Sequence, residues 1–149
     1  MTSNSAKFPK FLKLRTSDNQ VMEVSGQILN ESLVIRELFK ENNDNPTEVE
    51  IPVDYSQLKK VVKTLEVCDL NKPFVMFTDS PAKLIKFAAE NMQVLKFMTS
   101  LPGTDAAEIF TTSTTLFIPR LIMVFTAFMM ELEDGIGLKG MRERFGLNP

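Results

Sequence analysis

The chain of 149 residues contains no histidine, no tryptophan and a single cysteine, Cys68. Because histidine is absent, Ser-His-Asp and Cys-His catalytic centres are excluded, as are zinc sites built from cysteine and histidine. A single cysteine also excludes a disulfide bond within the chain. Its position after an apolar helical pattern indicates a buried, inert thiol. We expect the protein to bind no cofactor and no metal ion.

Long apolar runs and an excess of basic charge are missing as well. The longest uncharged apolar stretch, residues 121–130, is too short for a membrane-spanning helix, which needs about 20 such residues. The 17 basic and 19 acidic residues leave a net charge of -2, which disfavours a nucleic-acid-binding function. The single thiol and the lack of a signal peptide favour a reducing compartment, the cytoplasm, the nucleus or both.

The composition, with 44% apolar and 24% charged residues, is typical of a globular domain. Residues 11–15 and 21–24 alternate between apolar and polar side chains, which is typical of half-buried strands. The turn-forming residues 17–19 between them predict a hairpin. A third strand is predicted over 48–53, where Pro52 lacks an amide donor, so the strand lies at an edge or ends there.

Several helices are predicted from the residues that cap them. Ser32 precedes an apolar helical periodicity, and Asp54 with Gln57 forms a capping-box pattern at the start of another. The Ser-Pro pair at 80–81 begins a helix whose apolar face reaches Leu95. These spacings predict amphipathic helices that cover one side of a small sheet.

The middle of the chain is interrupted twice. Residues 69–79 are predicted to be a linker, and 74–77 within it also fit a short buried strand. The Pro-Gly pair at 102–103 breaks the chain again, and Thr104 or Asp105 is expected to cap the helix that follows.

The last third of the chain is predicted to be helical. Pro119 opens a helix that runs to about Glu133, where Gly135 and Gly137 are expected to end it. Residues 138–145 are expected to form a short amphipathic terminal helix. Apolar side chains surround the helix from Pro119 on nearly every side. Such a helix is either fully buried or partly covered by a partner, and both interpretations stay open at this point.

Several short strings along the chain follow the pattern of one known family. They lie at 12–19 (family pattern I-K-L-x-S-S-D-G), 21–24 (I-F-x-V), 32–38 (S-x-x-I-x-x-M-L), 49–53 (V-x-L-P-N-V), 58–62 (L-x-K-V-I), 116–121 (Y-L-D-I-K-x-L-L) and 141–148 (E-I-R-K-x-F-x-I-x-N). In this order they resemble the Skp family, the adaptors of SCF (Skp, cullin, F-box) ubiquitin ligases. Where that family carries an acidic mid-chain insert, residues 73–97 here are apolar and predicted to be helical.

The resemblance implies an α+β fold of the POZ/BTB type, a three-stranded sheet with helices that is extended by C-terminal helices. It divides the chain into a disordered N-terminus at 1–7, a POZ/BTB-like domain at 8–118 and a partner-binding extension at 119–149. It further implies a non-catalytic adaptor whose partners are an F-box-type protein and a cullin.

The resemblance also implies which residues would meet those partners. Thr114 and Thr115 stand where the family has an Asn-Tyr pair that faces the cullin. The expected F-box contacts are apolar residues of the C-terminal helices: Leu121, Val124, Phe128, Leu132, Met141 and Phe145.

Two other functional classes compete with the adaptor interpretation. A POZ-type fold with excess apolar surface can self-associate, so a structural protein that forms a homodimer or larger assembly is the alternative hypothesis. A small enzyme would need acids or lysines that converge on a polar pocket, and no pattern in the sequence indicates one. We therefore expect that the protein is not an enzyme.

Overall fold

The structure is a computed structural model that describes residues 8–41, 46–76 and 80–144; from residue 133 onward only the backbone is described. The N-terminal residues 1–7, expected to be disordered, lie outside these ranges. The elements, in chain order, are β1 (Phe11–Arg15), β2 (Val21–Ser25), α1 (Gly26–Leu29), α2 (Leu33–Glu41), β3 (Glu48–Glu50), α3 (Tyr55–Val67), α4 (Pro81–Glu90), α5 (Met92–Ser100), α6 (Gly103–Thr115) and α7 (Pro119–Arg144).

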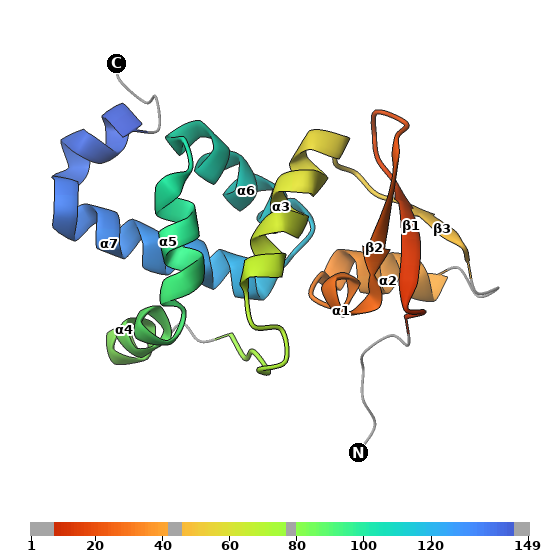
Figure 1. Cartoon of the computed structure of the whole chain (residues 1–149), viewed down its shortest axis with the longest axis horizontal. Coiled ribbons are helices and arrows are strands. Elements are labelled where there is room, and N and C mark those ends of the chain that lie inside the picture. The colour runs from red at the N-terminus through yellow and green to blue at the C-terminus, as the bar shows by residue number, and fades with distance from the viewer. Residues whose placement is uncertain (1–7, 42–45, 77–79, 145–149) are drawn as a thin grey trace.

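The predicted hairpin is present, and the predicted α+β class is confirmed. β1 pairs with β2 in antiparallel register, with Leu12 opposite Val24. Asn19 in the connecting turn has a φ of 62°, a left-handed conformation that asparagine adopts more readily than most residues. β3 adds to the other side of β1 in parallel, with Leu14 opposite Val49, so the strand order is β2-β1-β3. Figure 1 shows this mixed sheet at one end of the molecule, with α3 to α7 extending away from it.

β3 is shorter than the predicted strand, because it ends at Glu50. It is an edge strand, and it ends before Pro52, which agrees with the prediction from that proline. Although Ile51 and Val53 fall outside the strand, they remain buried. The Ile51 amide donates to the Arg15 carbonyl at 2.9 Å and the Ser17 amide donates to the Val53 carbonyl at 2.8 Å, so the two segments remain paired beyond the strands.

Three helix starts are as predicted. The Ser32 hydroxyl accepts a hydrogen bond from the Ile35 amide at 3.1 Å, ahead of α2. Asp54 and Gln57 form both hydrogen bonds of a capping box at the start of α3. Ser80 caps α4, and the proline that follows occupies its first turn.

The helical boundaries after α4 differ from the prediction. One helix was expected to continue to Leu95, but Asn91, with φ −125° and ψ 32°, separates α4 from α5. Its side-chain amide donates to the Phe87 carbonyl at 2.8 Å, which satisfies the end of α4 locally. The predicted caps Thr104 and Asp105 are wrong, because α6 already begins at Gly103 after Pro102, without a side-chain cap.

The C-terminal helix is longer than predicted. α7 continues from Pro119 to Arg144, so Gly135 and Gly137 do not end it, and no separate helix begins at residue 138. Glycine costs a helix interior only about 1 kcal/mol, and it ends a helix where the backbone turns left-handed rather than by its presence alone. The short strand considered at 74–77 is absent over 74–76, and residue 77 lies outside the described residues.

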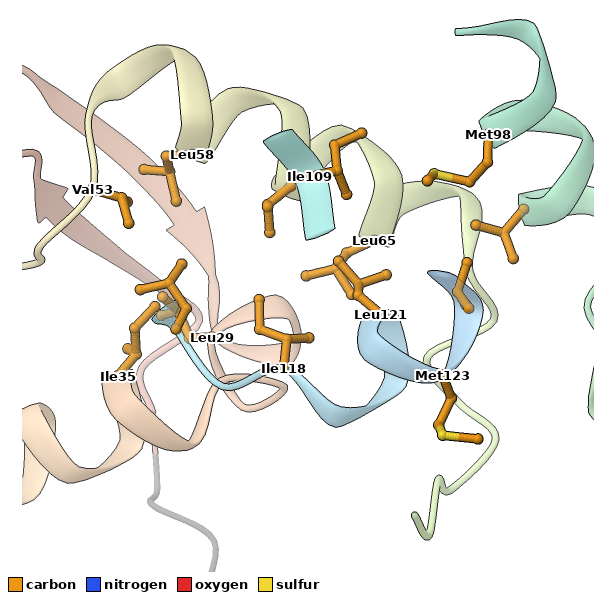
Figure 2. Close-up of a cluster of buried hydrophobic side chains, with 14 of the residues drawn as sticks. Leu29, Ile35, Val53, Leu58, Leu65, Met98, Ile109, Ile118, Leu121 and Met123 are labelled. Atoms are coloured by element: carbon orange, nitrogen blue, oxygen red, sulfur yellow. The ribbon is translucent and has the colours of Figure 1, made fainter. Parts of the chain in front are cut away.

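One cluster of buried apolar side chains connects the sheet with the C-terminal helices. Figure 2 shows Leu58 and Leu65 of α3 in this cluster, together with Ile109 of α6. Ile118 and Leu121 belong to the same cluster, so the expected domain boundary after residue 118 does not separate two cores among the described residues. Within that part of the chain, no helix has the combination of length and apolar character needed to cross a membrane.

Candidate partner-binding surface

The inner side of α7 is part of the core. α4, α5 and α6 pack against α7. Leu121, Val124 and Phe128 are 2%, 1% and 1% exposed. Three of the expected F-box contacts are therefore core residues that a partner cannot reach in this conformation. This corrects the sequence-based expectation, and the physical reason is that helices from residues 81–115 already cover that face.

The other three expected contacts have different positions. Leu132 is half-buried and packs against the edge of the cluster. Met141 lies in α7, in the part where only the backbone is described. Phe145 lies outside the described residues.

One row of α7 side chains, which includes Leu132, is only half-buried. Ile122, Phe125, Met129 and Leu132 are all half-buried. Their spacing of i, i+3, i+7 and i+10 places them on one side of the helix. We call these four residues the α7 stripe. The exposed side chain of Thr126 borders it.

α6 extends the apolar surface of the α7 stripe. The half-buried ring of Phe110 stacks on Phe125, with ring centroids 4.4 Å apart and an angle of 25° between the planes. Phe125 in turn lies 5.8 Å from the buried ring of Phe128. The outward residues are therefore anchored to the core through a chain of aromatic contacts, which gives the surface a defined shape.

The turn between α6 and α7 is fixed to the start of α2. The Leu33 amide donates to the Phe117 carbonyl at 3.0 Å, and the Ser32 hydroxyl donates to the Leu116 carbonyl at 2.6 Å. Phe117 has a φ of 46°, which is strained for a residue with a side chain, and its ring is 44% exposed. The turn thus exposes the Phe117 side chain, which precedes the α7 stripe in the sequence.

The predicted cullin-facing residues lie at the end of α6 and are exposed. The hydroxyls of Thr114 and Thr115 both donate to the Thr111 carbonyl, at 2.7 and 3.0 Å. These bonds hold the β-branched side chains within the helix despite their low helix propensity. The two residues offer methyl groups and satisfied hydroxyls to the solvent.

A buried ion pair fixes the start of α7. The Arg120 side chain donates from Nε to the Glu31 carboxylate at 2.7 Å and from Nη2 to the Lys72 carbonyl at 2.7 Å. It also donates to the Asp69 carbonyl at 3.4 Å and stacks against the Phe74 ring at 5.6 Å. One guanidinium therefore connects α7, the α1–α2 junction and the segment after α3.

The Cys68 thiol lies near this ion pair, and the charges of Arg120 and Glu31 act on it. Burial raises the pKa of the Cys68 thiol from 9.0 to about 11, so the thiol is protonated at neutral pH and is a poor nucleophile. In the parts of the chain that are described, no group of three or more acids and cysteines is arranged to hold a metal ion.

Comparison with known proteins identifies no family for this chain. No protein-family model matches the chain, and a comparison with curated proteins gave no match either. The sequence-based analysis missed Phe110, Ile122 and Met129, because a helix that is apolar all round does not reveal which side the rest of the chain covers.

Proposed function

We propose that the protein is a non-catalytic adaptor with a POZ/BTB-type fold, similar to the Skp family, that binds an F-box-type helical motif and connects it to a cullin ubiquitin ligase. Such an adaptor works by burying apolar surface inside a polar rim, without bond chemistry. The proposal places the protein in the cytoplasm, the nucleus or both.

The positions of the Skp-like strings support this proposal. The string at 12–19 spans β1 and the hairpin turn, and the one at 49–53 begins within β3. The string at 58–62 lies on α3, and the one at 116–121 spans the turn into α7. The matching strings therefore lie on the sheet and α3, which precede the helices at 81–115, and at the start of α7, which follows them.

The observation that carries the proposal is the α7 stripe. Although three other helices pack against α7, Ile122 and Met129 remain half-buried, next to the stacked rings of Phe110 and Phe125. A row of apolar side chains at helical spacing fits the apolar face of a partner helix. Methionine adapts its shape to different partners, which suits an adaptor with a variable client.

The cullin contact is the second half of the proposal. It rests on the position of Thr114 and Thr115, which are exposed at the end of α6. Two threonines supply less contact area than the Asn-Tyr pair of the family, so we expect a weaker cullin interaction than that family shows.

Calorimetric titration with F-box motif peptides encoded in the same genome tests the adaptor function. We expect at least one peptide to bind the wild-type protein. The double variant Ile122→Glu/Met129→Glu should weaken that binding at least about tenfold, because it places two charges in the interface. The matched control is Ile85→Glu, since Ile85 on α4 is 60% exposed and lies outside the α7 stripe. A full panel without binding, or an equal loss in the control, would refute the adaptor function.

Self-assembly is the second candidate, and the open edge of the sheet favours it. β2 is an edge strand, and Val21 on it is 38% exposed. An exposed edge can pair with the same edge of a second copy. Light scattering over a dilution series should then show a dimer that Val21→Lys converts to a monomer. A wild-type monomer at every concentration would eliminate this candidate.

A further inference from the structure

A second surface, separate from the α7 stripe, lies where α3, α5 and α6 meet. α3 packs against both α5 and α6. Between them is a groove of about 280 Å³. Its apolar lining comes from Phe97 and Leu101 at the end of α5 and from Ile109 of α6. None of its lining residues comes from α7, so it shares nothing with the α7 stripe.

Three lysines of α3 form one rim of this groove. Lys59, Lys60 and Lys63 all line it. Lys60 is paired with two acids of α6, at 3.3 Å from Asp105 and 2.6 Å from Glu108. The hydrogen bond to Glu108 is the largest cause of the raised pKa of Lys60, so this ammonium is already neutralised within the chain.

Lys59 and Lys63 differ from Lys60 in this respect. Both are exposed, and neither has an acidic partner within 4.0 Å among the described residues. They are four residues apart on one helix, where like charges repel and destabilise the helix. An acidic group from outside would relieve this repulsion, which gives the lysine rim a preference for negative charge.

The size and lining of the groove select the kind of ligand. Small-molecule sites usually enclose about 300–1,000 Å³, so this groove is at or below the lower end of that range and suits a single anchoring side chain. A free phosphate would leave the apolar lining of Phe97, Leu101 and Ile109 unfilled.

We propose that this groove binds an acidic amphipathic segment of a partner protein. An apolar side chain of that segment enters between Phe97 and Ile109, and its carboxylates lie against Lys59 and Lys63. The charge complementarity along the α3 rim is the argument for this occupant. The site goes beyond the proposed function, since it would exist whether or not the α7 stripe binds an F-box motif.

Fluorescence anisotropy with a labelled synthetic peptide tests the inference. The probe is a helical peptide of about 15 residues with leucines along one side and glutamates flanking them. Two matched peptides replace all glutamates by glutamine or all leucines by alanine. The protein variants are Lys59→Glu/Lys63→Glu and the control Lys72→Glu/Lys86→Glu, which makes the same charge change at exposed lysines outside the groove.

We expect saturable binding of the acidic leucine peptide and at least about tenfold weaker binding of both matched peptides. The Lys59→Glu/Lys63→Glu variant should weaken binding by at least the same factor, whereas the control pair should retain it within about twofold. The inference is overturned if the peptide does not bind, if the control variant loses as much, or if inorganic phosphate displaces the peptide at constant ionic strength. If the protein binds F-box motifs but not this probe, the groove proposal is refuted and the proposed adaptor function is not.

Discussion

The buried ion pair at the start of α7 gives a prediction that can be worked out from the structure. The side chains of Arg120 and Glu31 are only 6% and 15% exposed. Arg120→Met removes the cation and leaves the Glu31 carboxylate buried without its partner. The carbonyls of Asp69 and Lys72 lose a donor at the same time. Breaking a buried pair in this way costs about 3–5 kcal/mol.

A second ion pair in the same chain supplies the control. Arg15 and Glu48 have a similar contact of 2.6 Å, against 2.7 Å for Arg120 and Glu31, but their side chains are 32% and 34% exposed. Solvent screening weakens such a pair, so Arg15→Met should cost far less than Arg120→Met. The two substitutions are the same, but the sites differ in burial and in the additional acceptors, which are two backbone carbonyls for Arg120 and the Asn19 side chain for Arg15.

Urea unfolding followed by circular dichroism measures both costs. A loss of about 3–5 kcal/mol is a large part of the about 5–15 kcal/mol that stabilises a typical domain, so Arg120→Met is expected to be barely folded. The variant Glu31→Gln keeps an acceptor for Nε, but it leaves the buried Arg120 cation without a counter-charge, so we expect it to be destabilising as well. If Arg120→Met costs no more than Arg15→Met, the reasoning from burial is wrong.

Three further predictions concern the folded chain. Asp54→Ala removes the capping box of α3 and should lower the unfolding free energy by about 1 kcal/mol, and an unchanged urea midpoint would contradict this. Phe128→Ala should cost about 3–5 kcal/mol because the ring is buried, whereas Phe11→Ala, at a residue that is 51% exposed, should cost far less; equal losses would contradict the burial of the inner side of α7. Because the pKa of Cys68 is raised by burial from 9.0 to about 11, the folded state holds this proton more tightly than the unfolded state. The unfolding free energy should therefore fall between pH 9 and 11, by at most about 1.4 kcal/mol per pH unit from this group. Cys68→Ala should flatten that decline in urea titrations, and an equally steep decline would show that other groups cause it.

Much of the fold follows from local chemistry that the sequence displays. Asp54 and Gln57 predict the start of α3 because both capping-box hydrogen bonds form between residues three apart. The alternation around Leu12 and Leu14 predicts β1 because the same two side chains meet the core in the structure. By contrast, no proline or glycine marks the break at Asn91. The apolar periodicity therefore predicted one helix through Leu95, where the structure has two.

The candidate surface was harder to predict because it depends on contacts between distant parts of the chain. Val124 and Phe128 look like exposed docking residues only if the packing of α4 and α5 against α7 is unknown. Once those helices are in place, Ile122 and Met129 are the side chains that face outward. A uniformly apolar helix contains the right residues for both the core and the interface, and only the tertiary structure separates them.

The most direct test of the adaptor account is a titration of methyl-labelled protein with an F-box motif peptide, followed by NMR. The account predicts that the methyl signals of Ile122 and Met129 shift with the same saturation curve, while the signal of the exposed Ile85 on α4 stays in place. It would be contradicted by a peptide that binds and leaves Ile122 and Met129 unchanged, or by shifts at Ile85 that are as large as those on the α7 stripe.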